Sequence, residues 1–136
     1  MLSKRLSLFT VILCLVVAST AYSADKHPTG SWILVEINGE KIEGRAPTIE
    51  FTEKGMVGST GVNRFFGKYA DEGESLFGEG IGMTRRAGPP EAMKLERDYV
   101  NALKAVTTHR IEEEQLILEH GEKVKLVFKA APEDKE

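Results

Sequence analysis

The stretch Gly58–Tyr69, GSTGVNRFFGKY, decides how the rest of this chain is organised. Its glycines (Gly58, Gly61, Gly67) are dense enough to indicate backbone that adopts positive φ or approaches another segment closely. We expect the aromatic side chains of the motif to fill a core around that backbone: Phe65, Phe66 and Tyr69. The motif therefore predicts a structural crossing point of the fold. Asn63 and Arg64, at its centre, are the residues left open to a function.

Short apolar runs between turn signals predict β-strands on both sides of this motif. Strands are expected at residues 30–37, 41–43, 47–51, 56–60, 65–70, 107–111, 116–120 and 124–128. Two shorter apolar pieces, 76–77 and 81–84, are separated by glycine. Asn38-Gly39 predicts a hairpin between the first two strands, because both central residues of a type I′ turn need positive φ.

One amphipathic helix is expected at about residues 90–106, after the helix-breaking sequence Arg85–Pro90. Apolar residues recur there at spacings of three and four: Ala92, Leu95, Tyr99, Leu103 and Val106. The charged residues between them, Glu96 included, are expected to face away. The predicted fold class is α+β. We expect a curled antiparallel sheet or partial barrel of about seven or eight short strands, with the helix before a C-terminal β-hairpin.

The first 23 residues are predicted to be a cleaved signal peptide. Lys4 and Arg5 precede an apolar run at 6–18, which is shorter than the roughly 20 residues of a membrane span. The only cysteine, Cys14, lies inside this run, so we expect no lipid attachment and a cysteine-free mature chain. An uncleaved anchor is the alternative. The prediction is a periplasmic or secreted protein without a stable membrane anchor after cleavage.

The remainder is predicted to be a single domain at 30–130, between a flexible leader at 24–29 and a charged tail at 131–136. The whole chain carries 18 Lys and Arg against 21 Asp and Glu, and loss of the signal peptide removes two of the basic residues. This acidic balance argues against nucleic-acid binding, which needs a basic face. We expect a monomer.

In this order the motifs resemble the META/HslJ-like domain family of exported bacterial envelope proteins. The resemblance is carried by 32–34, 38–39, 47–51, 58–69, 84–96, 116–118 and 126–128. It covers nearly the whole mature chain. It implies a small β-rich exported domain that is associated with heat shock or envelope stress in some bacteria. No catalytic residue comes with the resemblance.

Two positions depart from the family pattern. Many members have cysteine where this chain has Val62 and Gly88, and the paired loss implies that those cysteines form a disulfide in the members that have them. Such a link would stabilise a domain by on the order of 3 kcal/mol. We therefore expect Val62 to pack near Gly88. The residues given a structural role are Gly58, Gly61, Val62, Phe65, Phe66, Gly67, Tyr69, Gly88 and Pro89.

Four polar residues form a candidate binding surface: Asn63, Arg64, Arg85 and Arg86. Asn63-Arg64 with nearby glycine N–H groups can bind an anion, and an arginine pair suits carboxylate or phosphate. For both Asn63-Arg64 and Arg85-Arg86, a purely structural role has more support than ligand binding. Asn63 would take a left-handed turn position, and Arg64 would be solvated or ion-paired. The arginine pair would lie in an exposed loop or a salt bridge, since Pro89 and Pro90 remove N–H donors.

The sequence predicts no catalytic residue, cofactor or metal site. His109, His120 and the acids at 112–114 are of metal-ligating types, but their spacing fits no rigid pattern, and a solvated acidic turn is expected. Ser59 and Ser75 lack the flanking residues of a nucleophile. Phosphate-loop and dinucleotide motifs are missing from the sequence as well.

These observations favour a non-enzymatic periplasmic domain of the envelope stress response that binds an unidentified protein or envelope component. The alternative is a carrier of a small hydrophobic ligand or lipid, held in a cavity between sheet and helix. A third interpretation, a hydrolase, rests on residue types alone.

Overall fold

A computed structural model describes residues 28–69, 76–77 and 80–132 of the chain. The predicted signal peptide, most of the predicted leader, the acidic turn expected at 71–74 and residues 133–136 of the tail lie outside these ranges. Of the leader, Pro28 is buried, and the Thr29 carbonyl accepts a hydrogen bond from the indole of Trp32 at 3.0 Å.

The described chain forms nine strands and one helix. In order they are β1 (Gly30–Ile37), β2 (Glu40–Lys41), β3 (Thr48–Thr52), β4 (Gly55–Ser59), β5 (Arg64–Gly67), β6 (Ile81–Met83), α1 (Pro90–Ala105), β7 (Thr108–Glu112), β8 (Gln115–His120) and β9 (Val124–Ala130). Each expected strand and the helix are present within a few residues of their expected bounds. Of the two shorter apolar pieces, 81–84 contains β6, and Leu76 and Phe77 form a buried turn instead.

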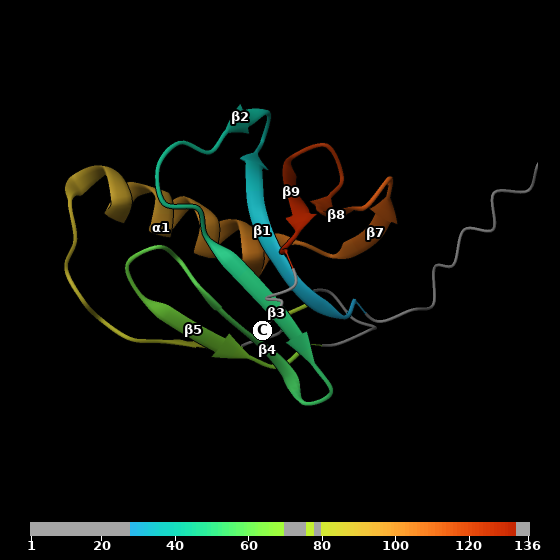
Figure 1. Ribbon diagram of the computed structural model, residues 1–136, viewed down its shortest axis with the longest axis horizontal. Helices are drawn as coiled ribbons and strands as arrows, with labels where there is room; N and C mark the ends of the chain where they lie inside the picture. The colour runs from blue at the N-terminus through green and yellow to red at the C-terminus, as the bar shows by residue number, and fades with distance from the viewer. Residues whose placement is uncertain (1–27, 70–75, 78–79, 133–136) are drawn as a thin grey trace, which may run out of the picture.

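All strands pair antiparallel in one sheet, in the order β6-β5-β4-β3-β1-β9-β8-β7, with β2 paired to β1. Figure 1 shows β3, β4 and β5 on one side of β1, β9, β8 and β7 on the other, and α1 behind the sheet. No pairing joins the end strands β6 and β7 within the described residues, so the curled sheet is open. This confirms the predicted α+β class.

The central strand β1 owes its place to its sequence. Trp32 and Leu34 point into the core, while Asn38 and Gly39 have φ of 49° and 88°, the positive values that the hairpin prediction requires. A second turn with positive φ, at Glu113 and Glu114, joins β7 to β8 where the sequence predicts only a polar link. Two consecutive glutamates do not predict such a turn, whereas Asn-Gly does.

Helix α1 covers the core face of the sheet. It begins directly after Pro89, and Pro90 occupies its first turn, where a missing N–H costs no helical bond. Its buried Tyr99 packs edge-on against Phe65, with ring centroids 5.7 Å apart, and in a tilted arrangement against Phe128, with centroids 6.2 Å apart. The helix therefore holds both halves of the sheet to one core.

The expectation that Phe66 fills the core is wrong. Its side chain is 60% exposed, because successive side chains of a strand point to opposite faces and Phe65 takes the inward position. Phe66 lies instead over Gly82 on the face opposite the core, which we call the outer face. Tyr69 does pack at the core, edge-on to Phe51 with ring centroids 5.5 Å apart.

Candidate functional site

Asn63 lies at a tight, buried turn between β4 and β5. The Thr60 N–H donates to the Asn63 carbonyl at 2.8 Å, and the Asn63 N–H donates to Thr60 Oγ1 at 2.9 Å. The prediction that Asn63 adopts the left-handed conformation is wrong: Gly61 does so, with φ of 97°. Because glycine absorbs the unfavourable backbone angle, the side chain of Asn63 turns inward.

The amide of Asn63 uses all of its hydrogen-bonding capacity. Nδ2 donates to Glu96 Oε2 at 2.8 Å and to the Arg86 carbonyl at 3.1 Å. Oδ1 accepts from the Arg86 N–H at 2.6 Å and from Thr84 Oγ1 at 3.0 Å. A primary amide has two donor hydrogens and two acceptor lone pairs, so none remains for a ligand. Asn63 thus joins β5, the loop before the helix and α1.

Glu96 is the structural residue that the sequence misplaces. Its side chain is only 5% exposed, and its Oε2 accepts from Thr60 Oγ1 at 2.6 Å as well as from Asn63. Two donors on one oxygen stabilise a carboxylate away from water. The expectation that Glu96 faces away is therefore wrong. A signal was present, because Glu96 falls in register with Ala92, Tyr99 and Leu103 at helical spacing.

Val62 packs directly against Gly88, as the paired departure from the family pattern predicts. A Cβ built on Gly88 would lie 3.7 Å from the Val62 Cβ and 2.9 Å from Val62 Cγ2. The first distance falls in the range of about 3.5–4.5 Å found across disulfides. The glycine-rich motif and the loop that enters α1 are thus in contact at this point.

A groove of about 660 Å³ crosses the outer face of β1, β3 and β4. Of the candidate binding residues, Arg64 and Arg86 line it, and they are joined by Arg45 from the loop between β2 and β3. Arg85 is exposed and does not line this groove. Arg45 was missed because nothing in its local sequence ties it to residues that are distant in the chain.

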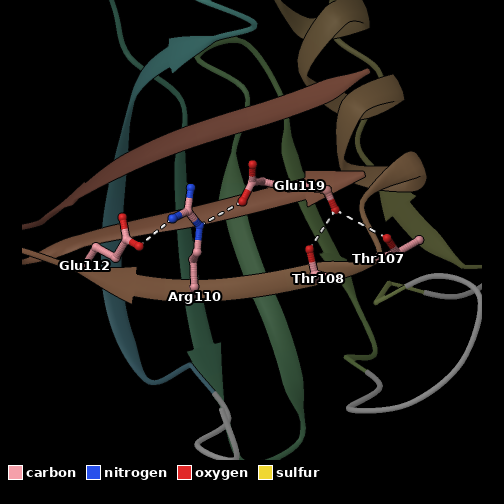
Figure 2. Close-up of polar contacts among 5 residues, drawn as sticks. All are labelled: Thr107, Thr108, Arg110, Glu112 and Glu119. Atoms are coloured by element: carbon pink, nitrogen blue, oxygen red, sulfur yellow. Dashed lines mark hydrogen bonds and ion pairs between the residues drawn. The ribbon is translucent and has the colours of Figure 1, made fainter. Parts of the chain in front are cut away.

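The three groove arginines have no side-chain partner in the part of the chain that the structure describes. Arg110, on β7, shows the contrast: in Figure 2 its guanidinium points toward two carboxylates, those of Glu112 and Glu119. Its Nε donates to Glu119 Oε1 at 2.8 Å, and this hydrogen bond is the main reason that its pKa is raised. The guanidinium of Arg110 is thus occupied by ion pairs within the protein, while the groove arginines face solvent.

The two histidines of the described residues are engaged with neighbouring hydroxyls. His109 Nδ1 lies 2.8 Å from the Tyr69 hydroxyl, and His120 Nδ1 lies 3.3 Å from Thr107 Oγ1. Within residues 28–69, 76–77 and 80–132, no three His, Cys, Asp or Glu side chains cluster so as to hold a metal ion. Helix α1, the helix of the described chain, is too short and too polar to cross a membrane.

Side chains from α1 and from the residue that follows it pack into the region between sheet and helix. Tyr99, Leu103 and Val106 are fully buried there. A separate cleft of about 470 Å³ opens beside the N-terminal half of α1, against the segment 40–45. Its lining mixes charged residues such as Lys94 with apolar ones such as Leu95.

Comparison with known proteins gives a family and two similar solved structures. A family model of the META domain matches residues 25–133. An NMR structure of a protein from Burkholderia xenovorans shares 25% identity with a TM-score of 0.61, and the match covers 75% of this chain and 81% of that one. A second NMR structure shares 27% identity with a TM-score of 0.60, over 78% of this chain and 92% of that one. No curated protein matches the chain.

Proposed function

Because the chain belongs to the META domain family, we propose that it is a non-catalytic binding domain for a protein or another component of the cell envelope. The proposal includes export by the predicted signal peptide, action in the periplasm and a contribution to tolerance of envelope stress. The fold and the family are compatible with it, and the solved relatives carry no named reaction.

One observation carries the binding role. Three of the candidate binding residues divide into two classes, one buried and the other exposed at the groove. Asn63 is buried and saturated by the protein itself, whereas the guanidinium groups of Arg64 and Arg86 lie at an open groove without a partner among the described residues. Unpaired arginines gathered at a groove are the groups that a binding partner contacts.

Site-specific photo-crosslinking in cells tests this function. A photoreactive residue at Glu50, which lines the groove, should give a discrete adduct that increases under heat or antibiotic stress. The matched control is Glu122, an exposed turn residue between β8 and β9 that is absent from the groove lining. Cell fractionation of the same strain tests the periplasmic location.

Two results would contradict the proposal. One is equal adduct formation at Glu50 and Glu122, which would indicate random encounter. The other is turnover of a generic ester, peptide or glycan substrate by the purified chain, lost on substitution of a named residue.

The described residues offer the carrier alternative at least two places to act: the cleft beside α1 and an apolar hollow of about 740 Å³ lined by residues such as Val57 and Phe66. A small ligand held in the cleft of about 470 Å³ beside α1 would lie against Leu95. Leu95→Lys would then abolish any ligand that is retained through native purification and detected by mass spectrometry. The groove variant Glu50→Gln would leave such a ligand in place.

A further inference from the structure

We propose that the groove over β1, β3 and β4 is a binding site for an acidic, extended segment of a partner protein. This inference rests on the binding function proposed above and names the chemistry that the site selects. Its basis is the convergence of Arg45, Arg64 and Arg86, three cations from distant parts of the sequence.

The groove is more positive than the chain that carries it. Arg45 comes from the β2–β3 loop, Arg64 from β5 and Arg86 from the loop after β6, and Glu50 is the one acid among the groove's described lining residues. The whole chain has a formal net charge of −3. A local excess of cations against this background favours an anionic ligand at this face.

The network around Asn63 fixes the position of two of these arginines. The backbone N–H and carbonyl of Arg86 both bond to the Asn63 amide, and the backbone of Arg64 pairs with Thr84 through two hydrogen bonds. The main-chain anchors leave both side chains free to reach the groove. Because the backbone is already held in place, mainly side-chain entropy is lost when each planar guanidinium binds a carboxylate through two hydrogen bonds.

The groove floor fits a peptide rather than a small ion. Ile33 and Val57 contribute apolar surface, and Thr48 and Ser59 contribute hydroxyls. A volume of about 660 Å³ accommodates several residues in an extended conformation. Aliphatic parts of such a segment would cover the floor while its carboxylates meet the arginines at the rim.

Larger polyanions fit the site less well. Binding to nucleic acid or to an anionic membrane depends on many cations spread over a broad face, and the net negative charge of the whole chain opposes it. Three arginines facing one acid match a short acidic segment. The arrangement therefore favours a protein ligand.

Fluorescence anisotropy with a labelled eight-residue peptide of alternating glutamate and glycine tests the proposal. The full chain should bind this peptide and not the glutamine counterpart. Arg64→Glu/Arg86→Glu should weaken binding by about tenfold or more, because two charge-assisted contacts become repulsive. Raising the salt concentration should weaken it as well. Glu50→Gln, which removes the acid from the groove, should strengthen binding about threefold.

The matched control is Arg85→Glu/Arg97→Glu, which changes the net charge equally at two exposed arginines outside the groove lining. It should alter affinity by less than about twofold. Equal losses in the two double variants would overturn the proposal, as would tighter binding of anionic phospholipid vesicles or of inorganic phosphate than of the peptide. Circular dichroism of each variant excludes unfolding as the cause.

Because Glu133, Asp134 and Glu136 follow the groove residue Pro132 in sequence, the assay is repeated with these three acids changed to amides. Failure of both forms to bind the acidic peptide overturns the proposal. A groove adduct in cells without peptide binding would reject the acidic ligand and leave the proposed function standing. Peptide binding without any adduct in cells would support the acidic-ligand chemistry of the groove and reject the proposed binding function in the cell.

Discussion

Asn63 Nδ2 lies 2.8 Å from Glu96 Oε2, and this hydrogen bond joins the turn before β5 to the middle of α1. Both side chains are almost fully buried, with exposed fractions of 2% and 5%. Every buried side-chain nitrogen and oxygen of the described chain has a hydrogen-bond partner. The polar residues inside this domain therefore act as a structural clasp, and removing one leaves others unsatisfied.

Replacing Asn63 should destabilise the domain strongly. Asn63→Ala removes one of the two donors to Glu96 and both Asn63 partners of the Arg86 backbone, and the loss of these hydrogen bonds should lower the free energy of unfolding by about 3 kcal/mol. Urea denaturation followed by circular dichroism measures this. Arg85→Ala, an exposed neighbour, is the control and should change the value by less than about 0.5 kcal/mol. Equal urea midpoints for Asn63→Ala and Arg85→Ala would contradict a stabilising role of the Asn63 hydrogen bonds.

Asn63→Asp should make stability depend on pH. The new carboxylate would face Glu96 across the former hydrogen bond, and two like charges there raise the pKa of one of them in the folded state. A raised folded pKa means that stability is present at low pH and is lost as the pH rises through that pKa. Urea midpoints at about pH 4 and about pH 7 should thus differ more for Asn63→Asp than for Asn63→Ala. Parallel pH profiles would count against this arrangement.

The contact between Val62 and Gly88 should accept a disulfide. With Cys14 replaced by serine, Val62→Cys/Gly88→Cys should oxidise to one internal bond, since the Cβ separation of 3.7 Å is already suitable. Closing a loop of about 26 residues should raise the free energy of unfolding by about 3 kcal/mol. Intact mass after alkylation, with and without reductant, detects the bond. The two single-cysteine variants should remain fully alkylated, and a fully alkylated double variant would refute the predicted geometry.

Gly58 should not tolerate a side chain. A Cβ at this position would lie 2.3 Å from the Thr48 carbonyl oxygen and 2.5 Å from Phe65 Cζ. The backbone is held in the β3–β4 pairing, so Gly58→Ala should lower the free energy of unfolding by about 2 kcal/mol. Gly80→Ala is the matched control, because a Cβ at Gly80 meets no described atom within 4 Å. Thermal melting of both variants compares them, and similar melting temperatures would show that the sheet yields at Gly58.

Stability should fall at alkaline pH because of Tyr99. Complete burial raises the pKa of its phenol well above the ordinary value of 10.0. The contribution of Tyr99 to the free energy of unfolding is therefore intact below pH 10.0. It is lost as the pH rises above that value, because the phenol ionises in the unfolded state and not in the folded state. Tyr99→Phe should flatten the profile from about pH 9 to about pH 11, at the small cost of a 3.4 Å hydrogen bond to the Thr48 carbonyl. An unchanged slope in this variant would assign the alkaline loss to other groups.

The strands and the helix were predictable because their signals are local. The alternation in β3 (Thr48–Thr52), the Asn38-Gly39 turn and the helical spacing of apolar residues each depend on a few neighbouring residues. The resemblance to the META domain family supplied the contact between Val62 and Gly88. These features set the architecture without knowledge of long-range contacts.

The site was less predictable because its groups meet only in the folded chain. Arg45, Arg64 and Arg86 come from three elements, and only the sheet brings them to one groove. Asn63 and Glu96 were misplaced for the same reason: a polar residue is buried only where its partners are, and these partners come from separate segments. Phe66 was misplaced by a single step in strand alternation, which flips a side chain to the other face.

The position of β1 between β3 and β9 has a consequence for how the chain folds. Trp32 pairs with Ile49 on one side and with Ala130 on the other. The central strand β1 is therefore fully paired only after β9, from the C-terminal end of the domain, has reached it. Closing the loop between β1 and β9 is slow because the two strands are far apart in sequence. Until β9 pairs, one edge of β1 has unpaired backbone N–H and C=O groups. Folding therefore completes only when the last strand is available. That delay suits a chain that crosses a membrane before it folds, as the proposed export requires.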